Sequence, residues 1–204
     1  MNSKEKAIEL DKKDTLQLFK KEFVHAENEI YFDGNSLGKL PIAAGEELTN
    51  AIENQWGKNL IRSWNDHWLS LTQRIATQLG RLLNAKENEI LIGDSTSVNL
   101  YKIVFSLMAS EKYPNQLLTD ELNFPTDNYI LQGIEKHFKA PKTLCLSYPN
   151  TTEAQLETIE KALEENPGIL CLSLVTYKSA YLYPMKRLNQ WAKKNNSIIV
   201  KDLS

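Results

Sequence analysis

The sequence has little of several features that would assign it to a protein class at once. Only two of its 204 residues are cysteines, both inside apolar runs, where cysteine behaves as a small hydrophobic residue. They form no CxxC motif, so nothing indicates disulfides or an oxidising compartment. The three histidines show no spacing typical of metal ligands, so we expect no structural metal.

Long apolar segments and a strong net charge are also missing. The most apolar segment, ILCLSLV at 169–175, is far too short to cross a bilayer. The polar first residues, MNSKEKAIELDKKD, lack the apolar core of a signal peptide. A formal net charge of -2 gives no reason to expect nucleic acid or an anionic membrane as a partner. The sequence therefore predicts a soluble, cytoplasmic globular protein.

Two nucleotide-binding motifs are absent as well. No G-x-G-x-x-G follows any apolar run. The segment GNSLGK, residues 34–39, resembles a phosphate-binding P-loop but is one residue short between its glycines. It also leads into Leu40, where a P-loop needs a Ser or Thr for magnesium, so this motif is excluded.

What the sequence does contain, from residue 69 onward, is a regular alternation of short apolar runs and amphipathic helical segments. Runs without strict apolar and polar alternation, separated by helices, predict an α/β domain with a mostly parallel sheet covered on both faces. Thr152 and Gln155 fit a capping box for the third of these helices. Residues 1–68 predict an irregular and helical N-terminal segment with a helix at Ala43–Gln55. The expected strands are 89–93, 116–119, 143–147, 169–175 and 197–201, and the expected helices are about 98–110, 127–138, 152–165 and 185–195.

Polar residues that follow the apolar runs are the candidates for a binding site, because ligands bind at the carboxyl ends of such strands. In DSTSVN, the hydroxyls of Ser95, Thr96 and Ser97 could cradle a phosphate at a helix start, or one of them could simply cap the helix. In NFPTDNY, Phe124 could stack on a flat aromatic ligand or belong to the core, and Thr126 or Asp127 could cap the next helix.

Asp202 ends the last apolar run, SIIVK. A carboxylate at the end of a buried strand is costly without a partner. A protonated heteroaromatic nitrogen, such as that of pyridoxal phosphate, is one partner that fits, because the carboxylate would hold the proton on the ring. The alternative is an aspartate that faces solvent or caps the next element.

Five motifs together, and in this order, closely resemble the kynureninases, a pyridoxal-phosphate-dependent family of fold type I in the aspartate-aminotransferase-like superfamily. They are YFDGNSLGKLP, RSWNDHW, DSTSVNLYK, NFPTDNYILQG and IIVKDLS. The resemblance runs from about Tyr31 to the end of the chain. It implies that residues 69–204 are the N-terminal part of the large, cofactor-binding domain, preceded by the segment 1–68.

The resemblance also implies roles for single residues. Thr96 and Ser97 correspond to contacts with the cofactor phosphate. Phe124 corresponds to the ring that stacks on the pyridine, and Asp127 lies close by. Asp202 corresponds to the partner of the pyridine nitrogen, and Ser173 to a hydroxyl near the cofactor. In one local departure, Ser179-Ala180 replaces the family's Thr-Gly pair.

The implied activity is hydrolysis of L-kynurenine or 3-hydroxykynurenine to anthranilate or 3-hydroxyanthranilate and L-alanine, in tryptophan catabolism and NAD biosynthesis, by a cytoplasmic homodimer. The family's Schiff-base lysine comes later in the sequence than the counterpart of Ser204, so we expect a truncated, poorly soluble and inactive fragment. The alternatives are a class V aminotransferase, a cysteine desulfurase, or a non-catalytic remnant of such an enzyme. Trp64 and His67 could reach the substrate pocket or serve only in packing.

Overall fold

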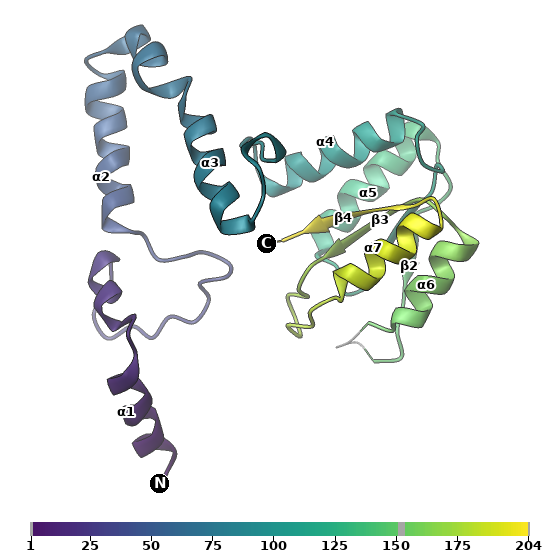
Figure 1. The fold of residues 1–204 in the computed structure, drawn as a ribbon, viewed down its shortest axis with the longest axis horizontal. Helices are drawn as coiled ribbons and strands as arrows, with labels where there is room; N and C mark the ends of the chain where they lie inside the picture. The colour runs from purple at the N-terminus through teal and green to yellow at the C-terminus, as the bar shows by residue number, and fades with distance from the viewer. Residues whose placement is uncertain (1, 151–153, 204) are drawn as a thin grey trace. The chain divides into compact units, whose positions relative to one another are not determined.

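The computed structural model describes residues 2–150 and 154–203, and Figure 1 shows their ribbon. The chain divides into two compact units, Met1–Ile92 and Gly93–Ser204, which we call the N-terminal unit and the sheet unit. Thr152, the expected cap of the third helix, lies outside the described residues. Gln155 is itself the N-cap of that helix, α6 (Leu156–Glu165), so the expected capping box is wrong. The predicted domain boundary after residue 68 concerns the domains of a whole enzyme and stays a prediction.

The N-terminal unit is helical and irregular, as the sequence predicts. Its α-helices are joined by short 3-10 and π-helical turns and by a loop that contains the DGNSLG motif. Its elements are α1 (Ser3–Lys13), η1 (Gln17–Glu22), α2 (Ile42–Asn50), η2 (Ala51–Trp56), η3 (Leu60–Arg62), η4 (Trp64–Trp68), α3 (Leu71–Leu83) and η5 (Glu87–Glu89).

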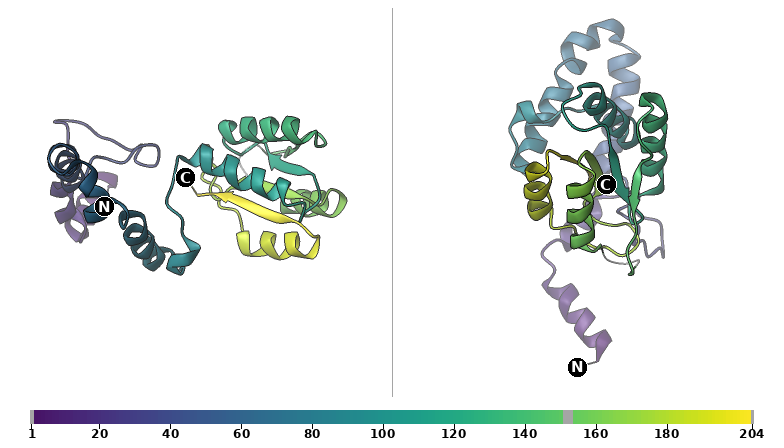
Figure 2. Two further views of the ribbon diagram at one scale, coloured as in Figure 1. Left: turned by 90° about the horizontal axis from the view of Figure 1, so that it is seen from above. Right: turned by 90° about the vertical axis from the view of Figure 1, so that its right-hand side faces the viewer.

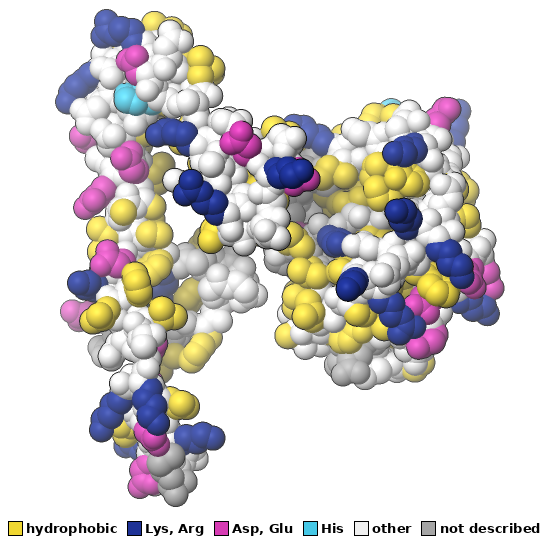
Figure 3. All heavy atoms as spheres, viewed as in Figure 1, with side chains coloured by type: hydrophobic (Ala, Val, Ile, Leu, Met, Phe, Trp, Pro, Cys, Tyr) yellow, Lys and Arg dark blue, Asp and Glu magenta, His cyan; other side chains and the backbone are white. Residues whose placement is uncertain are grey.

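Few side chains of the N-terminal unit are buried within the described structure. Ser63, Ala76 and Gly80 are its buried residues. Large apolar side chains such as Phe32, which is 91% exposed, lie at the surface, and Figure 3 shows hydrophobic side chains spread along this unit. The unit by itself therefore has almost no hydrophobic core.

The strand expected at 89–93 is wrong. After η5 the chain is extended but forms no strand, and Leu91 is 95% exposed. An extended segment becomes part of a sheet only when a neighbouring strand supplies hydrogen bonds along its length. None of the described strands pairs with this segment.

The sheet unit confirms the predicted fold class. Four parallel strands have the order β2-β1-β3-β4, and helices alternate with them along the chain. The strands are β1 (Leu117–Asp120), β2 (Leu144–Leu146), β3 (Ile169–Ser173) and β4 (Ile198–Asp202). The helices are α4 (Thr96–Ala109), α5 (Pro125–Phe138), α6 (Leu156–Glu165) and α7 (Met185–Lys194).

Helices cover both faces of this sheet, and Figure 2 shows the sheet between the α4–α5 pair and the α6–α7 pair. Successive residues of a strand point to opposite faces, which sorts the core into two clusters. Cys171 and Val200 pack in the cluster under α4 and α5, whose own members include Leu100, Val104 and Ile134. The other cluster lies under α6 and α7, and its members include Leu170, Leu172, Ile159, Leu163 and Leu188.

The strand order creates a topological switch point between β1 and β3. The chain leaves β1 through α5 to reach β2 on one side, and it leaves β3 through α7 to reach β4 on the other side. Connections that depart to opposite sides open a crevice at the carboxyl ends of two adjacent strands, and ligands of open α/β sheets bind there. We call this side of the sheet the carboxyl edge.

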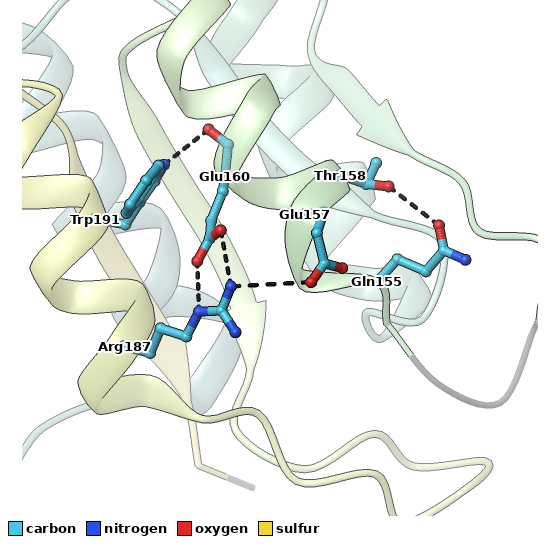
Figure 4. A network of polar contacts seen from close by, with 6 residues as sticks. All are labelled: Gln155, Glu157, Thr158, Glu160, Arg187 and Trp191. Atoms are coloured by element: carbon cyan, nitrogen blue, oxygen red, sulfur yellow. Dashed lines mark hydrogen bonds and ion pairs between the residues drawn. The ribbon is translucent and has the colours of Figure 1, made fainter.

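An ion pair joins the two helices on the face away from α4 and α5 (Figure 4). The Arg187 guanidinium on α7 donates from Nε and Nη2 to the two carboxylate oxygens of Glu160 on α6, at 2.6 and 2.9 Å. The Trp191 indole N–H donates to the Glu160 carbonyl at 3.0 Å. This two-point geometry fixes the spacing and rotation of α6 against α7.

The connection from β3 to α7 contains a tight turn whose backbone is strained. Ala180 has a φ of 55°, in the left-handed region that favours glycine. Its N–H donates to the Thr176 carbonyl at 2.9 Å, and the Tyr181 N–H donates to Thr176 Oγ1 at 3.0 Å. The turn is therefore made with alanine at a position whose backbone conformation favours glycine.

Replacement of Ala180 by glycine should stabilise the chain. The substitution removes the strain of the left-handed backbone, and this outweighs the greater conformational freedom that glycine gives the unfolded chain. We therefore expect the free energy of unfolding to rise by about 0.5–1 kcal/mol. Urea unfolding followed by circular dichroism measures it. Ala7→Gly, at an exposed position inside α1, is the control and should destabilise its helix instead. A loss of stability in Ala180→Gly would show that the turn is not strained.

Candidate functional site

All six residues predicted to bind a ligand lie in the sheet unit and converge on one corner of it. Helices α4 and α5 both run antiparallel to the strands, because α4 leads into β1 and α5 follows it. Their N-termini therefore lie at the carboxyl edge. Ser173 and Asp202 point to the same face as these helices, since they lie two residues beyond Cys171 and Val200. The six residues are Thr96, Ser97, Phe124, Asp127, Ser173 and Asp202.

The start of α4 separates the capping residue from the two predicted phosphate contacts. Ser95 is the N-cap, and its Oγ accepts a hydrogen bond from the Val98 N–H at 3.4 Å. Thr96 and Ser97 occupy the first two helical positions, whose N–H groups have no carbonyl four residues earlier inside the helix. These N–H groups, two hydroxyls and the helix dipole together favour an anion.

The start of α5 presents an aromatic ring. Pro125 is the first helical residue and Phe124 is the N-cap, so neither Thr126 nor Asp127 caps the helix. Phe124 is 45% exposed and is therefore not a core residue. Its ring meets Tyr177 in an edge-to-face contact with centroids 5.1 Å apart, which leaves at least one face of Phe124 uncovered by Tyr177.

Two carboxylates approach each other on this face. Asp127 is only 4% exposed. Burial raises the pKa of Asp127 from 3.8 to about 6, and the negative charge of Asp202 adds to the rise. Asp202 ends β4 and lies opposite Ser173 in the β3–β4 register. A cation placed between the two acids, such as a protonated ring nitrogen, would relieve the repulsion between them.

The sequence analysis missed Asp120, a buried acid at the end of β1 that faces α6 and α7. Asp120 accepts hydrogen bonds from the Tyr148 hydroxyl at 2.9 Å, the Tyr183 hydroxyl at 2.5 Å and the Leu122 N–H at 3.1 Å. Burial raises the pKa of Asp120, and these hydrogen bonds partly oppose the rise. Asp120 therefore anchors the turn that leads to Phe124. The sequence signal was available, because an acid follows QLLT just as Asp202 follows SIIVK.

A buried amide next to Phe124, Asn123, was also missed as a functional candidate. It is 3% exposed and connects β1, β3 and the start of α5 through its side chain. The motif NFPTD contains it, but the sequence gives no sign that its partners include Cys171 and Ser173, 48 and 50 residues away.

Two further candidates of the sequence analysis belong to the N-terminal unit. Trp64 and His67 belong to η4 of the N-terminal unit, where the Trp64 ring meets Trp68 edge-on at 5.8 Å. Across residues 2–150 and 154–203, no group of three or more acidic, histidine or cysteine side chains is arranged to hold a metal. Within the same residues, no helix has the length and apolar character needed to cross a membrane.

The raised pKa of Asp127 predicts a pH-dependent cost to stability. The folded state binds the Asp127 proton more tightly than the unfolded state does, so its stabilising contribution is complete below pH 3.8 and is lost as the pH rises through about 6. Asp127→Asn should remove this loss and make the chain more stable than wild type at pH 7. Urea unfolding over a pH series measures it, with the exposed Asp11→Asn as control. Parallel stability profiles for wild type and Asp127→Asn would contradict the assignment.

Comparison with known proteins finds sequence similarity to enzymes and a fold shared with enzymes. No family model matches it. It is 31% identical to a kynureninase of Pseudomonas fluorescens and 30% identical to one of Burkholderia pseudomallei, in each case over 100% of this chain and 49% of the relative. The chain thus spans about half the length of the curated relatives it matches, and the matched part is their N-terminal half.

Two solved structures share the fold of this chain over about half of their own length. The apo cysteine desulfurase of Thermococcus onnurineus has a TM-score of 0.72 at 15% identity and covers 92% of this chain and 47% of its own. A mutant of C-DES with glycine covalently linked to its PLP cofactor has a TM-score of 0.75 at 18% identity and covers 90% of this chain and 49% of its own. The predicted resemblance and fold are confirmed: by sequence the chain is similar to the N-terminal portion of kynureninases, and by fold it matches part of the fold type I enzymes that use pyridoxal phosphate.

Proposed function

We propose that the whole protein is a kynureninase-like, pyridoxal-phosphate-dependent hydrolase that cleaves L-kynurenine or its 3-hydroxy form to the anthranilate and L-alanine. One observation carries the proposal. The start of α4, an exposed aromatic ring and a pair of acids lie at the carboxyl edge of the sheet in a chain similar to kynureninases. These three groups fit the phosphate, the flat ring and the protonated nitrogen of pyridoxal phosphate.

Each residue then has a defined task. The α4 start, through Thr96 and Ser97, binds the phosphate and anchors the cofactor. Phe124 lies against the ring and excludes water from its face. Asp202 keeps the ring nitrogen protonated, and Asp127 adds negative charge beside it. Bound pyridoxal phosphate would supply an electron sink for the bond that is broken.

The cofactor-bonding lysine of kynureninases is expected in the second half of their sequence, which this chain does not match. That lysine both anchors the cofactor and moves protons during the reaction. The 204 residues alone should therefore bind the cofactor weakly and turn over no kynurenine.

The kynureninase-like function has two alternatives, another enzyme of the same fold and a non-catalytic remnant. A cysteine desulfurase or class V aminotransferase would share the fold, and a cysteine desulfurase is among the similar structures, at 15% identity. The higher identity to kynureninases, over the whole chain, favours kynurenine. A non-catalytic remnant would keep the fold without turnover.

Cofactor binding is tested by titrating the chain with pyridoxal phosphate and recording the absorption and fluorescence of the bound form. Asp202→Ala should weaken binding about tenfold to a hundredfold, because a charge-assisted hydrogen bond is lost. Asp11→Asn, on α1, is the control and should bind as wild type does. Equal affinity of Asp202→Ala and wild type would refute the role of Asp202.

Substrate class is tested on the whole gene product. Release of fluorescent anthranilate from kynurenine, with no sulfide from cysteine and no transfer of amino groups to keto acids, is the expected result. Sulfide release without anthranilate would favour the desulfurase, and no turnover of any of these would favour the remnant. Reading the coding DNA beyond codon 204 adds a check, since a kynureninase should encode a Tyr-Lys pair there.

We also propose that the whole protein works in the cytoplasm, in tryptophan catabolism leading to NAD, as a homodimer. The exposed apolar side chains of the N-terminal unit support an assembly that would cover them. Sedimentation equilibrium of the whole gene product should give twice the monomer mass. A monomer over the micromolar range would contradict it.

A further inference from the structure

A buried amide bridges the switch point below the candidate cofactor site. Asn123 lies in the turn between β1 and α5, and its side chain makes five hydrogen bonds to residues of three elements. Its Nδ2 group donates to Thr119 Oγ1 at 3.1 Å and to the Cys171 carbonyl at 3.3 Å. The amide nitrogen therefore ties the turn to both strands that border the crevice.

The amide oxygen of Asn123 holds two of the predicted ligand-binding residues. It accepts from the Phe124 N–H at 2.9 Å, from the Ser173 N–H at 3.1 Å and from the Ser173 hydroxyl at 2.7 Å. One oxygen atom thus fixes the backbone that carries the aromatic ring and the side chain that faces Asp202 across the β3–β4 register.

The hydrogen bond from Ser173 has a chemical consequence. A serine hydroxyl has a single proton, and here that proton is directed to Asn123. Ser173 Oγ can then only accept a hydrogen bond from a ligand. The ligand atom above it has to be a donor, such as a ring N–H or a phenolic O–H.

Only an amide fulfils both demands at this position. A carboxylate could accept the three hydrogen bonds but could not donate to Thr119 and the Cys171 carbonyl. An apolar side chain would leave five buried polar groups without the partner they have here, each at a cost.

We propose that Asn123 is a positioning residue of the cofactor site, which sets the Phe124 ring and turns the Ser173 hydroxyl so that it presents an acceptor to the ligand. The inference rests on the proposed function and extends it to a residue that would not touch the cofactor. It predicts that Asn123 and Ser173 act as one unit on cofactor affinity.

A double-mutant cycle in the whole gene product tests this unit, with pyridoxal phosphate as the probe. Asn123→Ala and Ser173→Ala should each weaken binding about tenfold, and the double variant should be weakened little further, because both changes remove the same oriented hydroxyl. Asn195→Ala, which removes another side-chain amide bonded to a carbonyl, is the control and should leave affinity unchanged. If the loss of affinity in the double variant equals the product of the two single losses, the two residues act independently and the proposal is overturned.

Amide hydrogen exchange gives a readout without ligand. In Asn123→Ala the N–H groups of Phe124 and Ser173 should exchange faster, whereas the N–H of Leu174, which donates to the Asp202 carbonyl, should keep its rate. Equal loss of protection at all three would indicate general unfolding and count against positioning.

A milder variant covers the case in which Asn123→Ala does not fold. Thr119→Val removes one acceptor of Asn123 while keeping the side-chain volume, and it should speed exchange at Phe124 and Ser173 to a smaller extent. Unchanged rates there would overturn the proposal. Absence of any pyridoxal phosphate binding by the whole gene product would instead overturn the proposed function, and the positioning role with it.

Discussion

The parallel pairing of β3 with β4 is the constraint on which the site depends. Its register puts Ser173 beside Asp202, and the pleat turns both toward the face covered by α4 and α5. A shift of one residue would send Asp202 to the other face, toward α6 and α7. Ile198 and Val200 pack in the cluster under α4 and α5, and Ile199 packs in the cluster under α6 and α7. This alternation fixes the register. The core therefore determines where the acid points.

Much of this arrangement could be predicted from the sequence, because it depends on local pattern. Apolar runs placed four of the strands to within two residues, and the polar residues behind them indicated the carboxyl edge. The strand at 89–93 could not be excluded, since strand formation depends on a partner. Asp120 and Asn123 were missed because their roles come from contacts with Tyr183 and Ser173, which are distant in sequence.

The structure also decides between readings that the sequence left open. Ser95 takes the capping role at α4, which leaves Thr96 and Ser97 for another use. Phe124 is the N-cap of α5 and its ring is partly exposed, so it does not belong to the core. Asp127 is buried next to a second acid, an arrangement that costs stability and that a bound cation would offset. Local strain of this kind is common at functional sites.

The position of β4 at the end of the sheet order has a consequence for the acid it carries. Among the described strands, β4 has one neighbour, β3, so the ladder restrains its backbone from a single side. The outer row of N–H and C=O groups is available to a further strand. Such a strand would hold the backbone of Asp202 from both sides, and the position of its carboxylate would then be more narrowly restrained.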